Sequence, residues 1–526
     1  MSARNLECDL LVVGYGAAGA AAAIEAADGG ASVLLVEKTR WPGGLSVVSA
    51  GGARMAYDAA AALAYLRETC GGRTPDDVLQ ALSEGMYEFP SWMQTLADQI
   101  GAALVVRPAY GNYPFEGYDS LGYVEVQALP PTLEFDFPIP QTVRNVSPAG
   151  ARFFGLLQAH VERRPVSVMT STRVARLLRN EDCEVDGAEL EDSQGRITVH
   201  ARQGVILACG GFEADAKLQS AWFEPAVVLN GSFRGNTGDG IRMAQALGAD
   251  LWHMWHFHGP YGFRHPDPTF PYGLYVKSFP MWTPGQDDTG LPVMPWILVD
   301  QLGQRFANEY EPYPGDTGVR HFSHIDGNRG RNTRLPAWMV LDAEGFSMYK
   351  LGRFIAHDAE IDFRWSEDNR RELDLGIFVQ AESLEDLAQC TGLPVTALEH
   401  SVQRWNAACE AGHDAAFGRR SSTMRPISRG PFYAAQVWPL VINTQGGPVH
   451  DADQRVLDVE GRPIPGLYAV GELGSAFGHL YMAGGNLAEC IVGGRRAAQH
   501  AVARSTAAKC QTNPSPPQQC PSLETE

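Results

Sequence analysis

Short apolar runs alternating with an alanine-rich segment define the beginning of the chain. CDLLVVG, residues 8–14, has the continuous apolar character of a buried strand. AAGAAAAIEAADGG, residues 17–30, has the composition of a helix, and ASVLLVEK, residues 31–38, repeats the strand pattern. The order predicts a compact β-α-β unit.

The periodicity further along predicts a first domain that is interrupted and then completed. A helical pattern covers residues 75–100, and strand patterns at 165–180 and 195–212 return to the first domain. Between residues 231 and 430 Trp, His, Pro and Tyr are frequent and the β-α alternation is lost, which indicates an inserted domain. We therefore expect a first domain from 1–230 and 431–505, an inserted domain at 231–430, and a disordered Pro/Gln/Ser-rich tail at 506–526.

Composition narrows the function classes. The chain has 526 residues and a formal charge of −19, which argues against nucleic acid and anionic membranes as partners. No apolar run is long enough to span a bilayer. The nine cysteines contain no C-x-x-C pair, so neither a zinc site nor a disulfide framework is indicated, and a cytoplasmic location is expected.

The motif GYGAAG joins the first predicted strand to its helix. Gly14, Gly16 and Gly19 have G-x-G-x-x-G spacing, which permits a tight turn, close approach to a pyrophosphate and close helix packing. The pyrophosphate would bind at the helix N-terminus, at Ala17 and Ala18. Glu37, at the end of the second strand, is placed to accept hydrogen bonds from a ribose. These features predict a dinucleotide site, and NAD stays possible from this unit alone.

Further motifs follow in an order that resembles a known family. They are WPGGLSVVSAGG (41–52), ILACGGF (206–212), NTGDG (236–240), GQRFANE (303–309), TQGG (444–447) and GLYAVGE with AGGNLAECIVGGRRAA (466–498). Together they resemble the fumarate reductase/succinate dehydrogenase flavoprotein superfamily. The resemblance implies an α/β fold: a Rossmann-like FAD-binding domain of the glutathione-reductase type with an inserted α+β capping domain.

The resemblance also implies which residues bind FAD. The expected cofactor residues are Gly14, Gly16, Ala17, Ala18, Gly19, Glu37, Lys38, Gly43, Gly44, Leu45, Ser46, Ser49, Ala50, Gly51, Gly52, Val174, Cys209, Gly210, Gly211, Asn236, Asp239, Gly471, Glu472, Asn486 and Leu487. The chain has no histidine before His160, so the covalent attachment seen in some members is not expected and FAD should be non-covalent. A helix N-terminus after GGN would stabilise negative charge on a reduced flavin.

The reaction is suggested by a tyrosine near the end of the chain. Fumarate-reducing members carry a substrate-binding His and Arg where this sequence has Gly478 and Met482, and a proton-donating Arg where it has Tyr313. Without those groups a dicarboxylate loses its bidentate partners. GHLY, Gly485 and Tyr313 instead resemble the 3-ketosteroid dehydrogenases of the same superfamily.

In that branch the resemblance implies roles for each group. Tyr481 and the Gly485 N–H would polarise a ketone oxygen, Tyr313 would take the α-proton, and the β-hydrogen would leave as hydride to flavin N5. A further tyrosine assists, for which Tyr110, Tyr113 and Tyr118 are candidates and Tyr113 is preferred. A tyrosine base requires surroundings that favour phenolate. The predicted substrate is a cyclic ketone, steroid-like or smaller.

Alternatives stay open at this point. The AGGN stretch follows the fumarate reductase pattern rather than the Gly-Pro-Gly of ketosteroid enzymes, so specificity for steroids does not follow. An ene-reductase with an external electron donor also competes with a dehydrogenase with an external acceptor. A flavin-binding electron-transfer or scaffold subunit is a rival from another class. The WHMWHFHGPYGFRH stretch, with His253, His256, His258 and His265, matches no metal spacing and is expected to form an aromatic pocket wall, so no metal is predicted.

Overall fold

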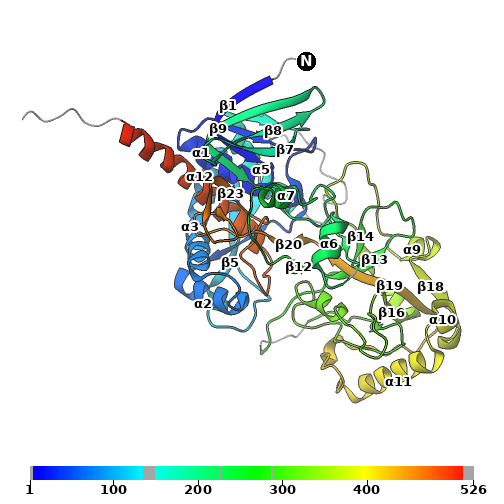
Figure 1. Ribbon diagram of the computed structural model, residues 1–526. Helices are drawn as coiled ribbons and strands as arrows, with labels where there is room; N and C mark the ends of the chain where they lie inside the picture. The colour runs from blue at the N-terminus through cyan, green and yellow to red at the C-terminus, as the bar shows by residue number, and fades with distance from the viewer. Residues whose placement is uncertain (1–3, 134–147, 226, 286–289, 513–526) are drawn as a thin grey trace, which may run out of the picture.

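The computed structural model describes residues 4–133, 148–225, 227–285 and 290–512, with side chains described as far as residue 504. The chain forms two lobes (Figure 1). The blue N-terminal and red C-terminal segments share one lobe, and the green and yellow middle segments form the other. This is the predicted architecture of a first domain completed by the chain's end.

An eight-stranded sheet forms the centre of the first lobe. Its main path runs β22-β23-β9-β1-β2-β6, with β9-β1, β1-β2, β2-β6 and β23-β9 parallel. The strands are β1 (Arg4–Val13), β2 (Val33–Val36), β6 (Val166–Met169), β7 (Arg173–Arg179), β8 (Val185–Asp192), β9 (Gly195–Leu207), β22 (Arg455–Leu457) and β23 (Pro463–Ala469). The parallel β1-β2 pair with its connecting helix confirms the predicted β-α-β unit.

Two helices from the two ends of the chain pack against this sheet and against each other. They are α1 (Ala17–Asp28) and α12 (Gly485–Thr512). Small residues make the close contact possible, since a Cβ on Gly494 would meet the carbonyl oxygen of Ala18 at 2.5 Å. The alanine-rich composition of α1 therefore reflects helix packing as well as helix propensity.

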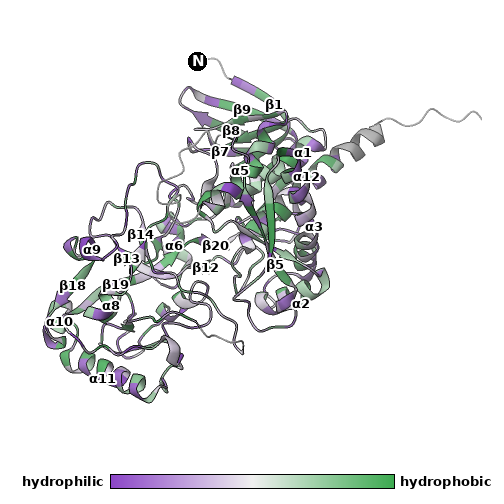
Figure 2. Ribbon diagram, turned by 180° about the vertical axis from the view of Figure 1, so that it is seen from behind, coloured by the Kyte–Doolittle hydropathy of each residue, from purple (hydrophilic) through white to green (hydrophobic). Residues whose placement is uncertain are grey.

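The predicted helix at 75–100 is confirmed as α3 (Asp76–Ile100). It packs in the first lobe with α2 (Ala59–Cys70), α5 (Ala149–Glu162) and a three-stranded sheet of β3 (Gly52–Ala56), β5 (Leu121–Ala128) and β4 (Ala103–Pro108). Figure 2 shows the apolar residues of β5 in green, as expected for a strand that is buried along most of its length. β5 pairs with β3, whose Gly52 lines the second cavity described below.

A second eight-stranded sheet organises the other lobe. Its strands are β10 (Leu229–Asn230), β13 (Tyr261–Arg264), β14 (Gly273–Val276), β15 (Ile297–Val299), β16 (Ala337–Asp342), β17 (Gly352–Arg353), β18 (Phe378–Ala381) and β19 (Phe432–Val441). The helices of this lobe include α8 (Ala343–Ser347), α9 (Arg370–Asp374), α10 (Leu384–Thr391) and α11 (Val395–Ala411). Two short helices, α6 (Ala216–Trp222) and α7 (Asp239–Gln245), come before them, and the buried residues of α7 pack in the core of the first lobe. The mixture of helices with a largely antiparallel sheet is the α+β cap that the sequence predicted.

The boundaries between the domains differ from the predicted ones. β19 pairs with β10, β13, β16 and β18, so residues 432–441 belong to the sheet of the cap and not to the returning first domain. The return comes after Val441 rather than at residue 431. At the C-terminus α12 continues to Thr512, so residues 506–512, which the sequence assigned to a tail, are helical. The remaining tail residues, 513–526, lie outside the described residues.

Two short antiparallel pairs connect the cap to the returning chain. β11 (Leu251–Trp252) pairs with β21 (Gly447–Pro448), and β12 (Phe257–His258) pairs with β20 (Asn443–Thr444). The second pair places His258 directly opposite Asn443. Among the described residues, no helix combines the length and apolar character that crossing a bilayer requires.

Candidate active site

A long cavity starts at the carboxyl end of β1 and encloses an empty volume of about 790 Å³. Most of the residues predicted to bind the cofactor line it. They are Gly14, Gly16, Ala17, Ala18, Glu37, Lys38, Gly44, Leu45, Ser46, Val174, Cys209, Gly210, Asn236, Asp239 and Glu472. The sequence motifs therefore converge on one cavity.

The turn before α1 has the geometry that a pyrophosphate site needs. Gly14 has a φ of 105°, and a Cβ there would meet the carbonyl oxygen of Ala208 at 2.3 Å. Ala17 N donates to Ser46 Oγ at 3.1 Å, which fixes the loop of Gly44–Val48 over the helix N-terminus. The helix dipole and the remaining N–H groups favour an anion here.

Charged residues mark the end of the cavity beyond β2. The Glu37 carboxylate accepts hydrogen bonds from Tyr15 N at 3.0 Å and Thr39 N at 2.8 Å. Lys38 Nζ donates to Asp239 Oδ2 at 2.7 Å across the cavity wall. Glu37 is thereby held in one orientation at the end of its strand, as the ribose role requires.

Five predicted cofactor residues line neither this cavity nor the second cavity described next. They are Gly19, Gly43, Gly51, Gly211 and Gly471. Each is instead at a point of close approach. A Cβ on Gly19 would meet the carbonyl oxygen of Gly14 at 1.9 Å, and one on Gly211 would meet Thr444 Oγ1 at 2.0 Å. In this structure these glycines shape the loops around the cavity rather than its surface.

A second cavity, with an empty volume of about 1070 Å³, lies next to the first. Leu45, Ser46, Glu472 and Cys490 line both, so the two cavities are adjacent and share a wall. Of the predicted cofactor residues, Leu45, Ser46, Ser49, Ala50, Gly52, Glu472, Asn486 and Leu487 line the second cavity. The cap contributes Ser232, His258, Tyr275, Arg353 and Ile355 to the same space.

The side-chain amide of Asn486 indicates whether a flavin fits the second cavity. Both its Oδ1 and its Nδ2 are buried without a hydrogen-bond partner among the described residues, and the residue lines the second cavity in the first turn of α12. A donor and an acceptor that are left unpaired in a buried cavity are costly unless a ligand completes them. The polar edge of an isoalloxazine ring offers both, so the residues present fit FAD.

Tyr481 lines the second cavity from the first lobe, as the predicted ketone-polarising role requires. Its ring lies 4.4 Å from the His258 ring and 5.5 Å from the Phe477 ring, and Asn486 N approaches its Oη at 3.4 Å. Burial raises the pKa of the Tyr481 phenol, so the hydroxyl keeps its proton and can donate a hydrogen bond.

Tyr313 and Tyr113 pack behind the cavity. Their rings lie 4.3 Å apart, Tyr113 Oη donates to the Tyr481 carbonyl oxygen at 3.1 Å, and Tyr313 Oη donates to the Asn112 carbonyl oxygen at 2.9 Å. Neither is among the described residues lining the second cavity, and burial raises the pKa of both phenols. These surroundings disfavour the phenolate that a tyrosine base needs, and Tyr313 as the proton acceptor stays a prediction.

The three candidate tyrosines of the first domain differ in how much of each residue is exposed to solvent. Tyr110 is 63% exposed and Tyr118 37% exposed, whereas Tyr113 is 4% exposed and contacts the Tyr481 segment. Of the three, Tyr113 is therefore the one the structure brings to Tyr481.

The N–H of Gly485, which the resemblance assigned to the ketone oxygen, has a partner within the protein. It donates to the Met482 carbonyl oxygen at 2.9 Å, and Gly485 is not among the residues that line the second cavity.

Histidine and arginine side chains of the cap are functional candidates that sequence reasoning missed or misjudged. His258 Nδ1 lies 3.0 Å from Asp316 Oδ1, at an angle that makes the contact electrostatic rather than a linear hydrogen bond. No partner of His258 Nε2 is found among the described residues. Arg353 lines the same cavity from β17. Neither residue lies in a motif, and only the pairing of distant strands brings them together.

The four histidines of the Trp252–His265 stretch contact different groups and do not gather around one point. His253 Nδ1 contacts the Ser475 carbonyl oxygen at 2.8 Å, His256 Nδ1 contacts the Phe477 carbonyl oxygen at 2.7 Å, and His265 Nδ1 accepts from Asp267 N at 3.1 Å. Within the described ranges no group of three or more potential metal ligands is found. Of the four histidines, His258 lines the second cavity.

Two buried carboxyl groups, Glu213 and Glu472, lie beside the cavities. Glu472 accepts from Thr444 N at 2.9 Å and from Asn236 Nδ2 at 3.3 Å. Burial raises the pKa of both, and the charge of Glu472 raises that of Glu213 further. A protonated carboxyl here avoids placing negative charge beside a flavin that must accept electrons.

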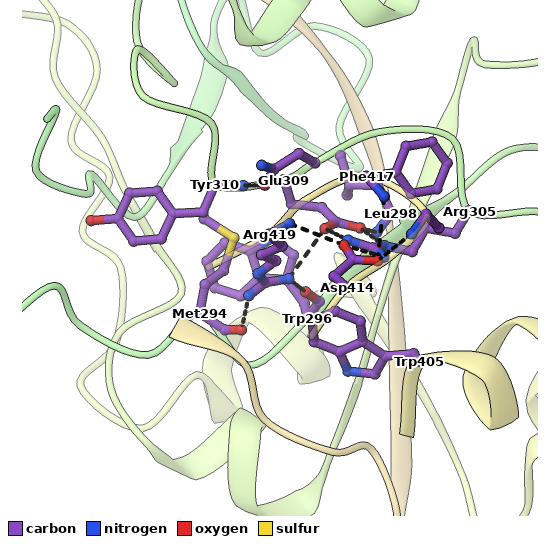
Figure 3. A network of polar contacts seen from close by, with 12 residues as sticks. Met294, Trp296, Leu298, Arg305, Glu309, Tyr310, Trp405, Asp414, Phe417 and Arg419 are labelled. Atoms are coloured by element: carbon purple, nitrogen blue, oxygen red, sulfur yellow. Dashed lines mark hydrogen bonds and ion pairs between the residues drawn. The ribbon is translucent and has the colours of Figure 1, made fainter. Parts of the chain in front are cut away.

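A buried ion network holds the cap segment that leads to Tyr313 and Asp316 (Figure 3). Arg305 donates twice to Glu309, at 2.8 Å each, and contacts Asp414 at 2.9 Å, while Arg419 contacts Glu309 at 3.2 Å. Leu298 N also donates to Glu309 at 2.9 Å. The GQRFANE motif thus fixes the start of the loop that carries Tyr313 and Asp316.

Comparisons with known proteins show the family to which the chain belongs. A family model described as "FAD binding domain" matches residues 9–487. The chain is 27% identical to 4-oxocyclohex-2-ene-1-carboxylate 5-dehydrogenase of Sinomonas cyclohexanicum, over 96% of this chain and 95% of that protein. It is also 27% identical to 3-oxosteroid 1-dehydrogenase of Mycobacterium tuberculosis, over 94% and 98%. Proteins named as reductases are among the relatives too.

The fold is similar to that of a solved enzyme. The crystal structure of 3-ketosteroid delta1-dehydrogenase from Sterolibacterium denitrificans superposes with a TM-score of 0.78 at 24% identity, covering 95% of this chain and all of that one. The family model and the relatives confirm the predicted resemblance to this superfamily and the predicted FAD. The chain belongs to the FAD binding domain family and is an FAD-dependent oxidoreductase.

Proposed function

We propose that the protein is an FAD-dependent dehydrogenase that introduces a double bond next to the carbonyl group of a cyclic ketone. The observation that carries the proposal is the position of Tyr481, whose buried phenol lines a cavity adjacent to the cofactor cavity. Burial raises the pKa of this phenol, which favours its protonated form. A ketone oxygen that receives a hydrogen bond from this phenol develops enolate-like charge at lower cost.

FAD would be held by the α1 turn, Glu37, Glu472 and Asn486, and when bound it supplies a two-electron acceptor for the hydrogen that leaves as hydride. The protein's own residues then have to bind the ketone, exclude water and remove one proton. Apolar side chains of the second cavity, among them Ile355, Ile442 and Leu487, contribute to the exclusion of water.

Two groups can take the α-proton. Tyr313 stays the prediction from family resemblance, but its hydroxyl donates to a backbone carbonyl and its burial opposes ionisation. His258 lines the cavity, and the Asp316 carboxylate favours the tautomer with its proton on Nδ1. Nε2 then carries the lone pair of a general base, so the geometry favours His258.

The names of the relatives support an oxidoreductase acting on a carbon–carbon bond, and they include both dehydrogenases and reductases. An ene-reductase with an external donor is therefore the second candidate. In the proposed direction an external acceptor reoxidises the flavin.

Anaerobic absorbance spectra separate the two directions. A saturated cyclic ketone should bleach the oxidised holoenzyme faster than the corresponding enone reoxidises the dithionite-reduced holoenzyme. If the enone reoxidises the reduced enzyme rapidly and no saturated ketone bleaches the oxidised one, the reductase assignment replaces the dehydrogenase.

A further inference from the structure

The guanidinium of Arg353 has no acidic partner among the described residues. It lies on β17 opposite Tyr275 of β14, and its side chain lines the second cavity. Its Nε is buried without a hydrogen-bond partner, and no ion pair to its guanidinium is found among the described residues. Its recorded neighbour is the Tyr275 ring, whose centroid lies 5.2 Å from the guanidinium carbon.

Other arginines of this chain with buried groups have an oxygen partner in the protein. Arg305 and Arg419 share the carboxylate of Glu309, although the Nε of Arg419, like that of Arg353, has no partner among the described residues. Arg54 donates to Asn112 Oδ1 and to the Ala483 carbonyl oxygen. Burial lowers the pKa of Arg353, yet a guanidinium stays protonated in proteins. A buried charge is normally paired, so the partner of Arg353 is expected to come from outside the chain.

FAD does not supply that partner. In the oxidised cofactor the anionic groups are the two phosphates, and the site expected for them is the N-terminus of α1 in the first cavity. Arg353 lines the second cavity, where Tyr481, His258 and Asn486 lie, and it is absent from the described lining of the first. The anion that meets Arg353 therefore belongs to the molecule bound beside Tyr481.

The surroundings of Arg353 suit a carboxylate attached to an apolar ring. Ser232 Oγ and Tyr275 Oη line the same cavity and are hydrogen-bonded to each other at 2.5 Å, which leaves one of the two hydroxyl protons for a ligand. Ile355 and Ile442 supply apolar surface in the same cavity. A planar guanidinium can bind both oxygens of a carboxylate, which fixes the orientation of the ring that carries it.

We propose that Arg353 binds a carboxylate on the substrate, so that the protein acts on a cyclic keto acid in preference to a neutral ketone. The ketone half of this statement rests on the proposed function, whereas the carboxylate half rests on Arg353 alone. The substrate is then held at two points, its ring ketone at Tyr481 and its acid at Arg353.

A binding experiment with the oxidised holoenzyme tests the carboxylate site without turnover. Binding is measured by the change that it causes in the flavin absorbance spectrum. The probe is cyclohexanecarboxylate, which has the acid and lacks the ketone, against its methyl ester. Wild-type protein should bind the acid at least 10-fold more tightly than the ester. Arg353→Met should weaken acid binding by about 10- to 100-fold, leave ester binding unchanged, and retain FAD. Arg353→Lys should recover part of the preference, since it keeps the charge but not the planar fork.

The matched control is Arg264→Met on β13 of the same sheet, where the guanidinium stacks on Trp438 outside the second cavity and should not affect the preference. Equal binding of acid and ester by wild-type protein would overturn the proposal, whatever the variants do. Loss of FAD from both Arg353 variants would assign the arginine to the cofactor and also overturn it.

Turnover of 4-oxocyclohexanecarboxylate and its methyl ester then separates this inference from the proposed function. Equal turnover of both would leave ketone dehydrogenation standing and remove the carboxylate. Preferential binding of the acid with no bleaching by either ketone would leave the carboxylate site and remove the reaction.

Discussion

The rings of His258 and Tyr481 lie 4.4 Å apart, although His258 belongs to the inserted cap and Tyr481 to the segment that completes the first domain. His258 reaches this place because β12 pairs with β20, and Tyr481 because the segment before α12 returns to the first lobe. The proposed proton acceptor and the proposed ketone-polarising phenol therefore meet only in the folded protein.

Replacing Tyr481 tests the polarisation of the ketone. Tyr481→Phe removes a hydrogen bond that strengthens as charge develops on oxygen, and the loss of one such donor costs about 100- to 1000-fold in kcat. We expect the variant to keep FAD and its fold, and the measurement is steady-state turnover with a dye as acceptor. Tyr110→Phe, at a position that is 63% exposed, is the matched control and should turn over like wild-type. Full activity of the Tyr481 variant would contradict the role.

Replacing His258 tests the proton acceptor. His258→Gln should slow exchange of the substrate's α-hydrogen with deuterated solvent by about 100-fold, as expected for loss of a general base. Asp316→Asn should slow it less, because Asp316 acts by orienting the imidazole. NMR of the ketone measures the exchange, with His265→Gln as a control outside the second cavity. If Tyr313→Phe abolishes exchange while His258→Gln does not, the base is the tyrosine.

The buried network of Figure 3 predicts a large effect on stability. Glu309→Gln leaves Arg305 and Arg419 partly uncompensated at a fully buried site, which should lower the free energy of unfolding by about 3–5 kcal/mol. Urea unfolding of the holoenzyme measures this. Glu360→Gln, which breaks the exposed pair with Arg234, should cost no more than about 1 kcal/mol. Equal losses for the two variants would contradict the account of the network.

Glu489 predicts how stability depends on pH. Burial raises its pKa from 4.5 to about 8, although Ser475 Oγ and Ala476 N donate to it. Between those two values the folded state holds a proton that the unfolded state has released, so this group's contribution to stability falls as pH rises from about 5 to about 8. Below that window the contribution is constant.

Glu489→Gln should therefore flatten the pH dependence of urea unfolding over the same window, by about 3–5 kcal/mol between its ends. Glu88→Gln, at an exposed position of α3, is the control and should leave the slope unchanged. Parallel curves for wild-type and Glu489→Gln would show that the carboxyl titrates normally in the folded protein.

The cofactor end of the site could be predicted from sequence because its chemistry is local. The glycines of the first turn, Glu37 and the loop after β2 are close together in the chain, and the structure brings Gly14, Gly16 and Ser46 to one cavity. The domain boundary at 431 was wrong because the apolar run of β19 continues into the segment that returns to the first lobe, without any break in pattern.

The substrate end could be predicted only in part. Tyr481 was found by family resemblance, and it lines the cavity. Arg353 and the His258–Asp316 contact depend on strand pairing and loop packing between distant segments, which no local spacing reveals. The hydrogen bond of Gly485 N to Met482 is likewise set by the turn before α12, where the sequence pattern is mixed.

The most direct test of the central claim is anaerobic mixing of oxidised holoenzyme with 4-oxocyclohexanecarboxylate deuterated at the carbons β to the ketone. The account predicts that the flavin bleaches, that one enone forms per flavin bleached, and that deuteration slows the bleaching. A flavin that stays oxidised while the keto acid is bound, or bleaching without any enone, would contradict it.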